Sequence, residues 1–152
     1  MMALTIWQPW ASLIAIGAKP FEFRHWPAPA RLVGQRIVNH AGARPVRRAE
    51  IADLLIRLRD DPRSTGLIPE LALPLLERVH LNPGILPLAS ALGTAVLGQP
   101  RQANRIFTGD GDSDRVDHHI WAWPLTDYEP FEPPIAAKGA QGFWRWVEAA
   151  HG

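Results

Sequence analysis

The stretch that decides the fold is Leu4–Trp26, LTIWQPWASLIAIGAKPFEFRHW. Its first part, Leu4–Trp7, predicts a short apolar strand. Pro9 then suits the first turn of a helix, where its missing N–H costs nothing, and Gly17 is a good left-handed cap for that helix. The next segment, Phe21–Arg24, alternates with a period of two residues, which is typical of a strand. Charged groups therefore gather where a helix gives way to a strand, and this pattern predicts a functional site.

Three charged side chains form the polar part of this predicted site. Glu22 and Arg24 share one face of the second strand, close enough for a charge-assisted hydrogen bond, and Lys19 lies just before it. Trp10 and Trp26 flank the three and offer flat surfaces on which a nucleic-acid base can stack. Two structural alternatives stay open: a purely structural Glu22–Arg24 ion pair, and a core position for Trp10. The tryptophans at 7, 144 and 146 are expected to pack in the core or along its edge.

The composition describes an ordinary single globular domain. The chain has 152 residues, is 47% hydrophobic and carries a formal net charge of +1, so bulk charge neither favours nor excludes nucleic acid. It contains no cysteine, which excludes disulfides, zinc–thiolate sites, iron–sulfur clusters and thiol nucleophiles. We find no signal peptide and no apolar run long enough for a membrane span, so a cytoplasmic protein is expected.

The rest of the chain predicts short strands around a helical segment. Strands are expected at 34–41, 93–98 and 118–125, an extended segment at 128–134 and a closing aromatic segment at 143–147. A helix is expected at 45–61, with arginines on its outer side that are either solvated or in contact with phosphate: Arg47, Arg48, Arg57 and Arg59. Pro74 interrupts the pattern at 69–81, which predicts two short turns or a late-starting helix. The sum is an α+β fold, a small, partly open β-barrel of five or six short strands with an N-terminal helix.

Metal and cofactor motifs are absent from the sequence. Asp110, Asp112 and Asp114 imitate the start of a calcium loop, but Arg115 stands where that loop needs glycine and Trp121 where it needs glutamate. The histidines show no HExxH or i, i+4 pairing, and no dinucleotide or phosphate-binding glycine motif occurs. We therefore expect neither a metal nor a cofactor.

The chain resembles the ASCH domain, a branch of the PUA-like superfamily of RNA-associated β-barrels. The residues that carry the resemblance are Gln8-Pro9-Trp10-Ala11, the spacing Gly17-x-Lys19-x-x-Glu22-x-Arg24, and Trp26. Residues 34–40, 91–97, 121–127 and 138–144 resemble further strands of that barrel. The resemblance implies that 1–152 is a single ASCH (PUA-like) domain and that 45–85 is a helical insertion within it.

This resemblance implies a cleft between the first helix and the sheet, with RNA or a modified nucleotide as its ligand. The residues favour single-stranded RNA or a flipped base, with Lys19 and Arg24 on phosphate or carbonyl oxygens and Glu22 on the base edge. The predicted nucleic-acid contacts are Gln8, Trp10, Lys19, Glu22, Arg24, Trp26 and His40. His40 is expected to be a hydrogen-bonded strand residue whose face could reach the cleft.

Two other functions stay open. Some family members are similar to hydrolases, either metal-independent ribonucleases or amidohydrolases of N4-acetylcytidine, and in that case Lys19 and Glu22 would be the catalytic residues. In the amidohydrolases a threonine stands three positions after the lysine, and Glu22 occupies that position here. The third hypothesis is a coactivator-like module that docks a protein partner through the helices of 45–85.

Overall fold

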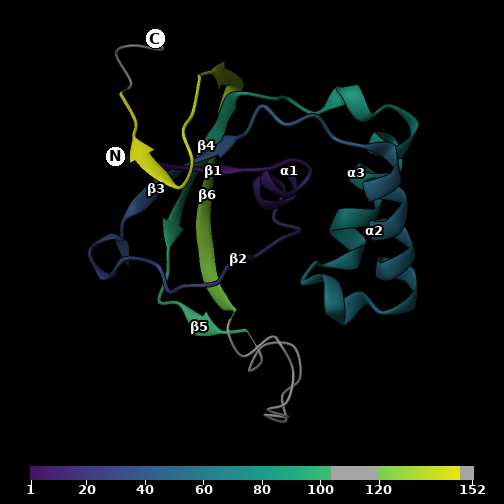
Figure 1. Ribbon diagram of the computed structural model, residues 1–152, viewed down its shortest axis with the longest axis horizontal. Coiled ribbons are helices and arrows are strands. Elements are labelled where there is room, and N and C mark those ends of the chain that lie inside the picture. The colour runs from purple at the N-terminus through teal and green to yellow at the C-terminus, as the bar shows by residue number, and fades with distance from the viewer. Residues whose placement is uncertain (104–119, 148–152) are drawn as a thin grey trace.

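A computed structural model describes residues 1–103 and 120–147 of the chain (Figure 1). The helices are α1 (Trp10–Ala15), α2 (Arg48–Asp60) and α3 (Pro69–Leu81). The strands are β1 (Met2–Ile6), β2 (Phe21–Arg24), β3 (Arg36–Ala41), β4 (Ser90–Leu97), β5 (Arg101–Gln102), β6 (Trp121–Ala136) and β7 (Phe143–Arg145). Across these residues, no helix combines the length and the apolar character that crossing a membrane would need.

The strands form one curled sheet in the order β2-β6-β4-β3-β1-β7, with the two-residue β5 added beside β6. The β1–β3 pair is parallel and the other pairs are antiparallel. The curl brings β6, the second strand of this order, close to β7 at its far end, because Trp123 of β6 stacks on Phe143 of β7 with ring centroids 5.7 Å apart. The predicted α+β class, with a partly open barrel of short strands and an N-terminal helix, is confirmed.

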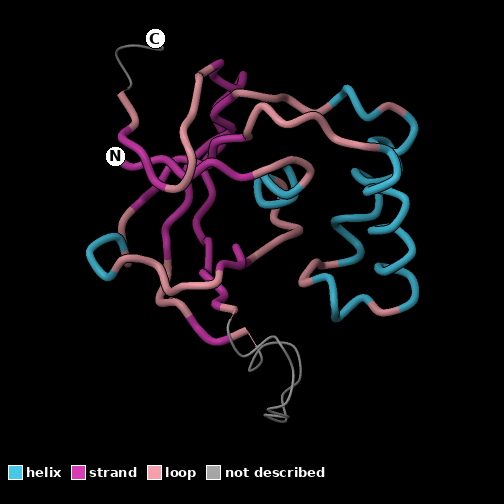
Figure 2. Tube along the Cα trace, in the orientation of Figure 1, coloured by secondary structure: helices cyan, strands magenta, loops and turns pink. Residues whose placement is uncertain are grey.

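Helix α1 lies between the sheet and the other two helices (Figure 2). Its Ala11 and Ile14 belong to the core inside the sheet, whereas Leu13 belongs to the core formed with α2 and α3. Trp10 packs against both cores. The short first helix is thus the element that joins the barrel to the helical pair.

Helix α3 is one continuous helix, although the sequence predicts two short turns or a late start. Pro69 occupies its first turn, and Pro74 lies inside it on the exposed side. A proline in a helix interior removes one backbone hydrogen bond. The buried residues Ala72, Leu76 and Val79 hold the opposite side of α3 in the second core, and this packing outweighs the missing bond.

Strand β6 joins two segments that the sequence treats separately, 118–125 and 128–134. The prolines of β6 are accommodated by irregular pairing with β4. The register between the two strands shifts between Ala91 and Gly93 and again between Thr94 and Val96. Gly93 pairs with Pro130, and a Cβ at this glycine would lie 2.5 Å from the carbonyl oxygen of Glu129. The two strands can approach this closely only because residue 93 has no side chain.

Candidate functional site

Lys19, Glu22 and Arg24 converge at the junction of α1 and β2. Lys19 Nζ lies 3.6 Å from Glu22 Oε1, and Arg24 Nη2 lies 3.8 Å from Glu22 Oε2. Lys19 is only 4% exposed and Glu22 7%, whereas Arg24 is half-buried. The structure therefore brings together the three charged residues that the sequence selects, with the glutamate between the two cations.

The end of α1 positions Lys19. Gly17 adopts a φ of +79°, and the N–H groups of Ala18 and Lys19 both donate to the carbonyl oxygen of Leu13. This turn directs the lysine back under the aromatic side chains, so that Nζ lies 4.6 Å from the ring centroid of Phe23. Lys19 Nζ also donates to the carbonyl oxygen of Phe21. The Lys19 ammonium group is thus held by the Phe21 carbonyl oxygen, the Glu22 carboxylate and the Phe23 ring.

Glu22 carries a buried acceptor that lacks a donor. Its Oε1 accepts the backbone N–H of Phe23 at 2.9 Å. Within the described residues, Oε2 is buried and makes no hydrogen bond, because the nearby Arg24 instead donates from Nη2 to the carbonyl oxygen of Thr5 at 3.3 Å. A buried acceptor without a donor is costly, so Oε2 is poised to accept an N–H from a ligand.

Burial changes the chemistry of Lys19. Desolvation lowers the pKa of its ammonium group below the ordinary value of 10.5, and this effect exceeds the opposing attraction of Glu22. Arg24 adds a smaller repulsion in the same direction as burial. Lys19 thus releases its proton more readily than an exposed lysine does.

Two cavities adjoin this group and a third lies beyond them, and we call the three inner, middle and outer. The inner cavity, of about 350 Å³, is lined by Lys19 and Glu22 together with Arg57, Ser64 and Thr65 from the helical segment. Residues of the predicted 45–85 insertion therefore line the same cavity as the charged group. All four predicted outer arginines, Arg47, Arg48, Arg57 and Arg59, are exposed, in agreement with the solvated alternative, and Arg57 also lines the inner cavity.

The hydroxyl groups of the inner cavity are engaged with the backbone. Thr65 donates from Oγ1 to the carbonyl oxygen of Pro62 at 2.6 Å, and Ser64 donates from Oγ to that of Asp61 at 2.8 Å. The sequence did not select these residues, because nothing in the spacing relates positions 64 and 65 to Lys19.

The middle cavity, of about 610 Å³, lies on the other side of Glu22. Trp10, Glu22 and Phe23 line both it and the inner cavity. Arg24 and Trp26 complete its polar and aromatic lining, and Trp26 is 57% exposed. The flanking tryptophans of the sequence analysis therefore both lie beside the charged group, Trp10 partly packed and Trp26 open to solvent.

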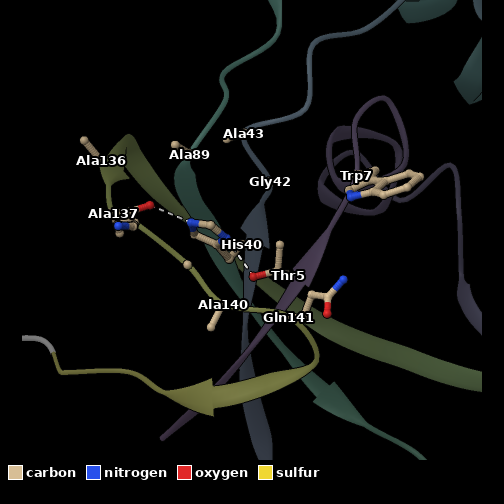
Figure 3. Close-up of a pocket in the computed structure, with 12 residues that line it drawn as sticks. Thr5, Trp7, His40, Gly42, Ala43, Ala89, Ala136, Ala137, Ala140 and Gln141 are labelled. Atoms are coloured by element: carbon tan, nitrogen blue, oxygen red, sulfur yellow. Dashed lines mark hydrogen bonds between the residues drawn. The ribbon is translucent and has the colours of Figure 1, made fainter.

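The outer cavity, of about 660 Å³, has a hydrogen-bonded floor made by Thr5 and His40 (Figure 3). His40 Nε2 lies 2.7 Å from the carbonyl oxygen of Ala137, which can only accept, so Nε2 carries the proton. His40 Nδ1 then accepts from the Thr5 hydroxyl at 3.1 Å, and Trp144 Nε1 donates to Thr5 Oγ1 at 2.9 Å. Gly139 closes over this floor, since a Cβ there would lie 2.4 Å from the His40 ring.

Two predicted contact residues lie apart from the charged group. Gln8 is 1% exposed and uses its amide inside the protein, where it donates to Ser12 Oγ and the carbonyl oxygen of Pro87 and accepts from the Ser12 N–H. It lines none of the three cavities. His40 lines the outer cavity, and neither of the two around Glu22.

Trp7, which was expected to pack in the core or along its edge, is 57% exposed and so is not a core residue. It follows β1 with the same alternation as Thr5, so it lies on the cavity side of the strand rather than on the side of Leu4 and Ile6, which are buried. Trp7 lines both the middle and the outer cavity. Lys138 and Gln141 also line the outer cavity. The sequence indicated these two residues only as part of a closing strand.

The described residues contain no cluster of three or more side chains suited to hold a metal ion. Asp110, Asp112 and Asp114, whose spacing imitates a calcium loop, lie outside the described residues. The same is true of His118 and His119.

Comparison with known proteins gives similar solved structures but no match in sequence. No protein-family model matches the chain, and no curated protein matches it. A serine-to-alanine mutant of an ASCH protein from Zymomonas mobilis is 17% identical, with a TM-score of 0.48 over 96% of this chain and 87% of that one. A tyrosine-to-phenylalanine mutant of that protein is 16% identical, with a TM-score of 0.47 over 96% and 88%.

A further structure, of ASCH from the same organism, is 17% identical, with a TM-score of 0.41 over 85% of this chain and 68% of that one. All three of these solved structures are ASCH structures from Zymomonas mobilis.

Proposed function

We propose that the protein recognises single-stranded RNA or a modified nucleotide at the charged group beside α1. One observation carries the proposal: Glu22 Oε2 is a buried acceptor without a hydrogen bond at the boundary of two cavities of nucleotide size. The amino and imino groups on the pairing edge of an unpaired base are donors of the kind this oxygen lacks.

The surrounding residues supply the other contacts of a nucleotide. Trp26 and Trp10 give flat surfaces next to the carboxylate, and stacking of one base is worth about 1–3 kcal/mol. Arg24 and Arg57 are the more exposed cations and receive the phosphate. Lys19 is too deeply enclosed for that expected role and instead holds the Glu22 carboxylate in place. A cytoplasmic location remains part of this proposal.

Binding of a labelled random-sequence RNA octamer, followed by fluorescence anisotropy, tests the proposal. Wild-type affinity is expected to fall as salt rises from 50 to 200 mM, because phosphate contacts release counterions. Glu22→Gln should weaken binding about tenfold or more, since it removes a charge-assisted hydrogen bond. The matched control is Glu77→Gln, an exposed glutamate on α3, which should bind like wild type. Equal affinity of the two variants, at unchanged melting temperatures, would refute the role of Glu22.

The lowered pKa of Lys19 favours hydrolysis as the second candidate function. A larger neutral fraction of this amine near neutral pH suits a general base that deprotonates a 2′-hydroxyl or a water molecule. Against this, the hydroxyls of Ser64 and Thr65 donate to backbone carbonyls instead of to Lys19.

The hydrolase alternatives separate in two assays. Labelled RNA incubated with the protein and a chelator should be cleaved faster as pH rises, and not at all by Lys19→Met. Acetate release from N4-acetylcytidine tests the amidohydrolase. Intact RNA and unchanged nucleoside after long incubation at high protein concentration exclude both activities. Protein docking through the helices of 45–85 also remains a proposal, for which the exposed Ile56 and Leu71 supply apolar surface.

A further inference from the structure

The three cavities adjoin one another in a row, inner, middle and outer. Trp10, Glu22 and Phe23 line both the inner and the middle cavity, and Thr5, Trp7 and Gln141 line both the middle and the outer one. Each pair of neighbouring cavities is therefore bounded by side chains that both cavities share. A ligand that extends from the Glu22 site toward the outer cavity therefore passes Trp7.

Trp7 is held as a platform between the middle and outer cavities. More than half of its side chain is exposed, and the guanidinium carbon of Arg44 lies 4.7 Å from its ring centroid. Arg44 is itself fixed by a two-pronged contact with Glu50. An exposed tryptophan whose ring is held in place by a cation offers a stacking surface for a base. Because the side chain is already ordered, it loses little rotamer entropy when the base binds.

The outer cavity suits the flat face of a base. Alanines make much of its wall, and in Figure 3 they surround His40: Ala43, Ala89, Ala136 and Ala140. At its floor, Thr5 Oγ1 has two hydrogen-bond partners among the described residues, Trp144 and His40. A hydroxyl oxygen has two lone pairs, and Trp144 takes one of them. Gly139 packs against this side of the oxygen, since a Cβ there would lie 2.8 Å from Thr5 Oγ1, so the outer cavity offers a base mainly its apolar wall.

The charges along this row of cavities match a phosphate backbone. Arg57 lines the inner cavity, Arg24 the middle one and Lys138 the outer one. Among the described lining residues of the outer cavity there is no carboxylate. Alternation of aromatic or apolar surface with a cation is the arrangement that single-stranded nucleic acid requires, because its bases and phosphates alternate in the same way.

We propose that the outer cavity is a second base subsite, so that a single strand of RNA runs from Glu22 past Trp7 to the Thr5–His40 floor and the protein binds at least two consecutive nucleotides. This inference rests on the proposed function of the Glu22 site. It identifies the ligand as an oligonucleotide instead of a lone nucleoside, and it adds a second set of contacts in the outer cavity.

Calorimetric titration with two kinds of probe tests the inference: an unlabelled random-sequence RNA octamer, and each of the four nucleoside 5′-monophosphates. The variants are Lys138→Ala and Ala140→Glu, both at exposed positions of the outer cavity, so folding is not at risk. Each should weaken octamer binding about tenfold and leave the affinity for the monophosphates within twofold, because a single nucleotide occupies only the Glu22 site. Arg31→Ala, which removes an exposed cation outside the three cavities, is the matched control and should change neither.

The outcomes separate the two proposals. If Glu22→Gln weakens octamer binding but both outer-cavity variants stay within twofold of wild type, the second subsite is refuted and the proposed function stands. If wild type binds no octamer, or if Glu22→Gln leaves octamer binding unchanged, the proposed function fails and the second subsite fails with it.

Discussion

At the scale of single residues, the site depends on a buried lysine that lies next to a buried glutamate. Taking both groups out of water is costly, and the 3.6 Å contact between Lys19 Nζ and Glu22 Oε1 only partly offsets this cost. The direction of the Lys19 pKa shift records the balance, since desolvation exceeds the attraction of the carboxylate. The cost of burying the Lys19 ammonium group can therefore be measured as a change in stability with pH.

We predict that the stability contributed by Lys19 rises with pH. The pKa of Lys19 is lower in the folded protein than the ordinary 10.5 of the unfolded chain. Between these two values the unfolded state binds the extra proton, so raising the pH favours folding, by at most about 1.4 kcal/mol per pH unit. Below the lowered pKa the effect disappears.

Urea unfolding of wild type and Lys19→Met between pH 7.5 and 10.5 checks this. The difference in unfolding free energy should shift in favour of wild type as the pH rises. The exposed Leu81 provides the control, because Leu81→Met changes no titratable group and should give a difference that does not change with pH. A flat difference for Lys19→Met as well would mean that its amine is not desolvated.

At the scale of elements, the sequence correctly predicted the helices and strands whose hydrophobic periodicity matches the faces that they bury. β2 matches its prediction at 21–24, and α2 lies within the predicted 45–61. The helical pattern at 69–81 matches the bounds of α3, but the predicted interruption at Pro74 was wrong, because burial against α1 and α2 outweighs the local effect of the proline. Local patterns carry no information about such tertiary compensation.

The candidate site shows the same division. Lys19, Glu22 and Arg24 lie within six positions of one another, so the alternation of one strand was enough to bring them together. Thr5 and Lys138 meet in the outer cavity only because β1, β3 and the segment after β6 lie side by side in the curled sheet. No local pattern could have related residues so distant in the chain, and for the same reason the sequence assigned Trp7 only to the core or its edge and not to a cavity.

Gly93→Ala tests the close contact between β4 and β6. A methyl group there would lie 2.5 Å from the carbonyl oxygen of Glu129 and 2.8 Å from the Tyr128 ring, so the strands must separate. We expect a loss of at least about 1–3 kcal/mol in unfolding free energy, measured by chemical denaturation. Gly84→Ala is the control, since its methyl group would meet only Asn82 Oδ1 at 3.5 Å. Equal stability of the two variants would contradict the packing described for these strands.

At the scale of the whole molecule, two hydrophobic cores share one short helix. The seven tryptophans lie at positions 7, 10, 26, 121, 123, 144 and 146, so none lies in the segment that holds α2 and α3. Tryptophan fluorescence therefore reports mainly on the barrel, whereas circular dichroism at 222 nm reports mainly on the helices. These two signals make the coupling between the cores observable.

We predict that both signals change at the same urea concentration, because α1 places Leu13 in one core and Ile14 in the other. Leu13→Ala, at a fully buried position, should lower both midpoints together and cost about 2–5 kcal/mol. If ellipticity were lost first while the fluorescence stayed native, the helical segment would be an independent folding unit.

The hydrogen bond from His40 to the carbonyl oxygen of Ala137 has a spectroscopic consequence. It fixes the imidazole as the tautomer with its proton on Nε2, in a ring that is almost fully buried. Such a proton exchanges slowly with water and resonates far from the amide protons in a nuclear magnetic resonance spectrum. The resonance of this proton is therefore a spectroscopic reporter of the contact between His40 of β3 and the segment after β6.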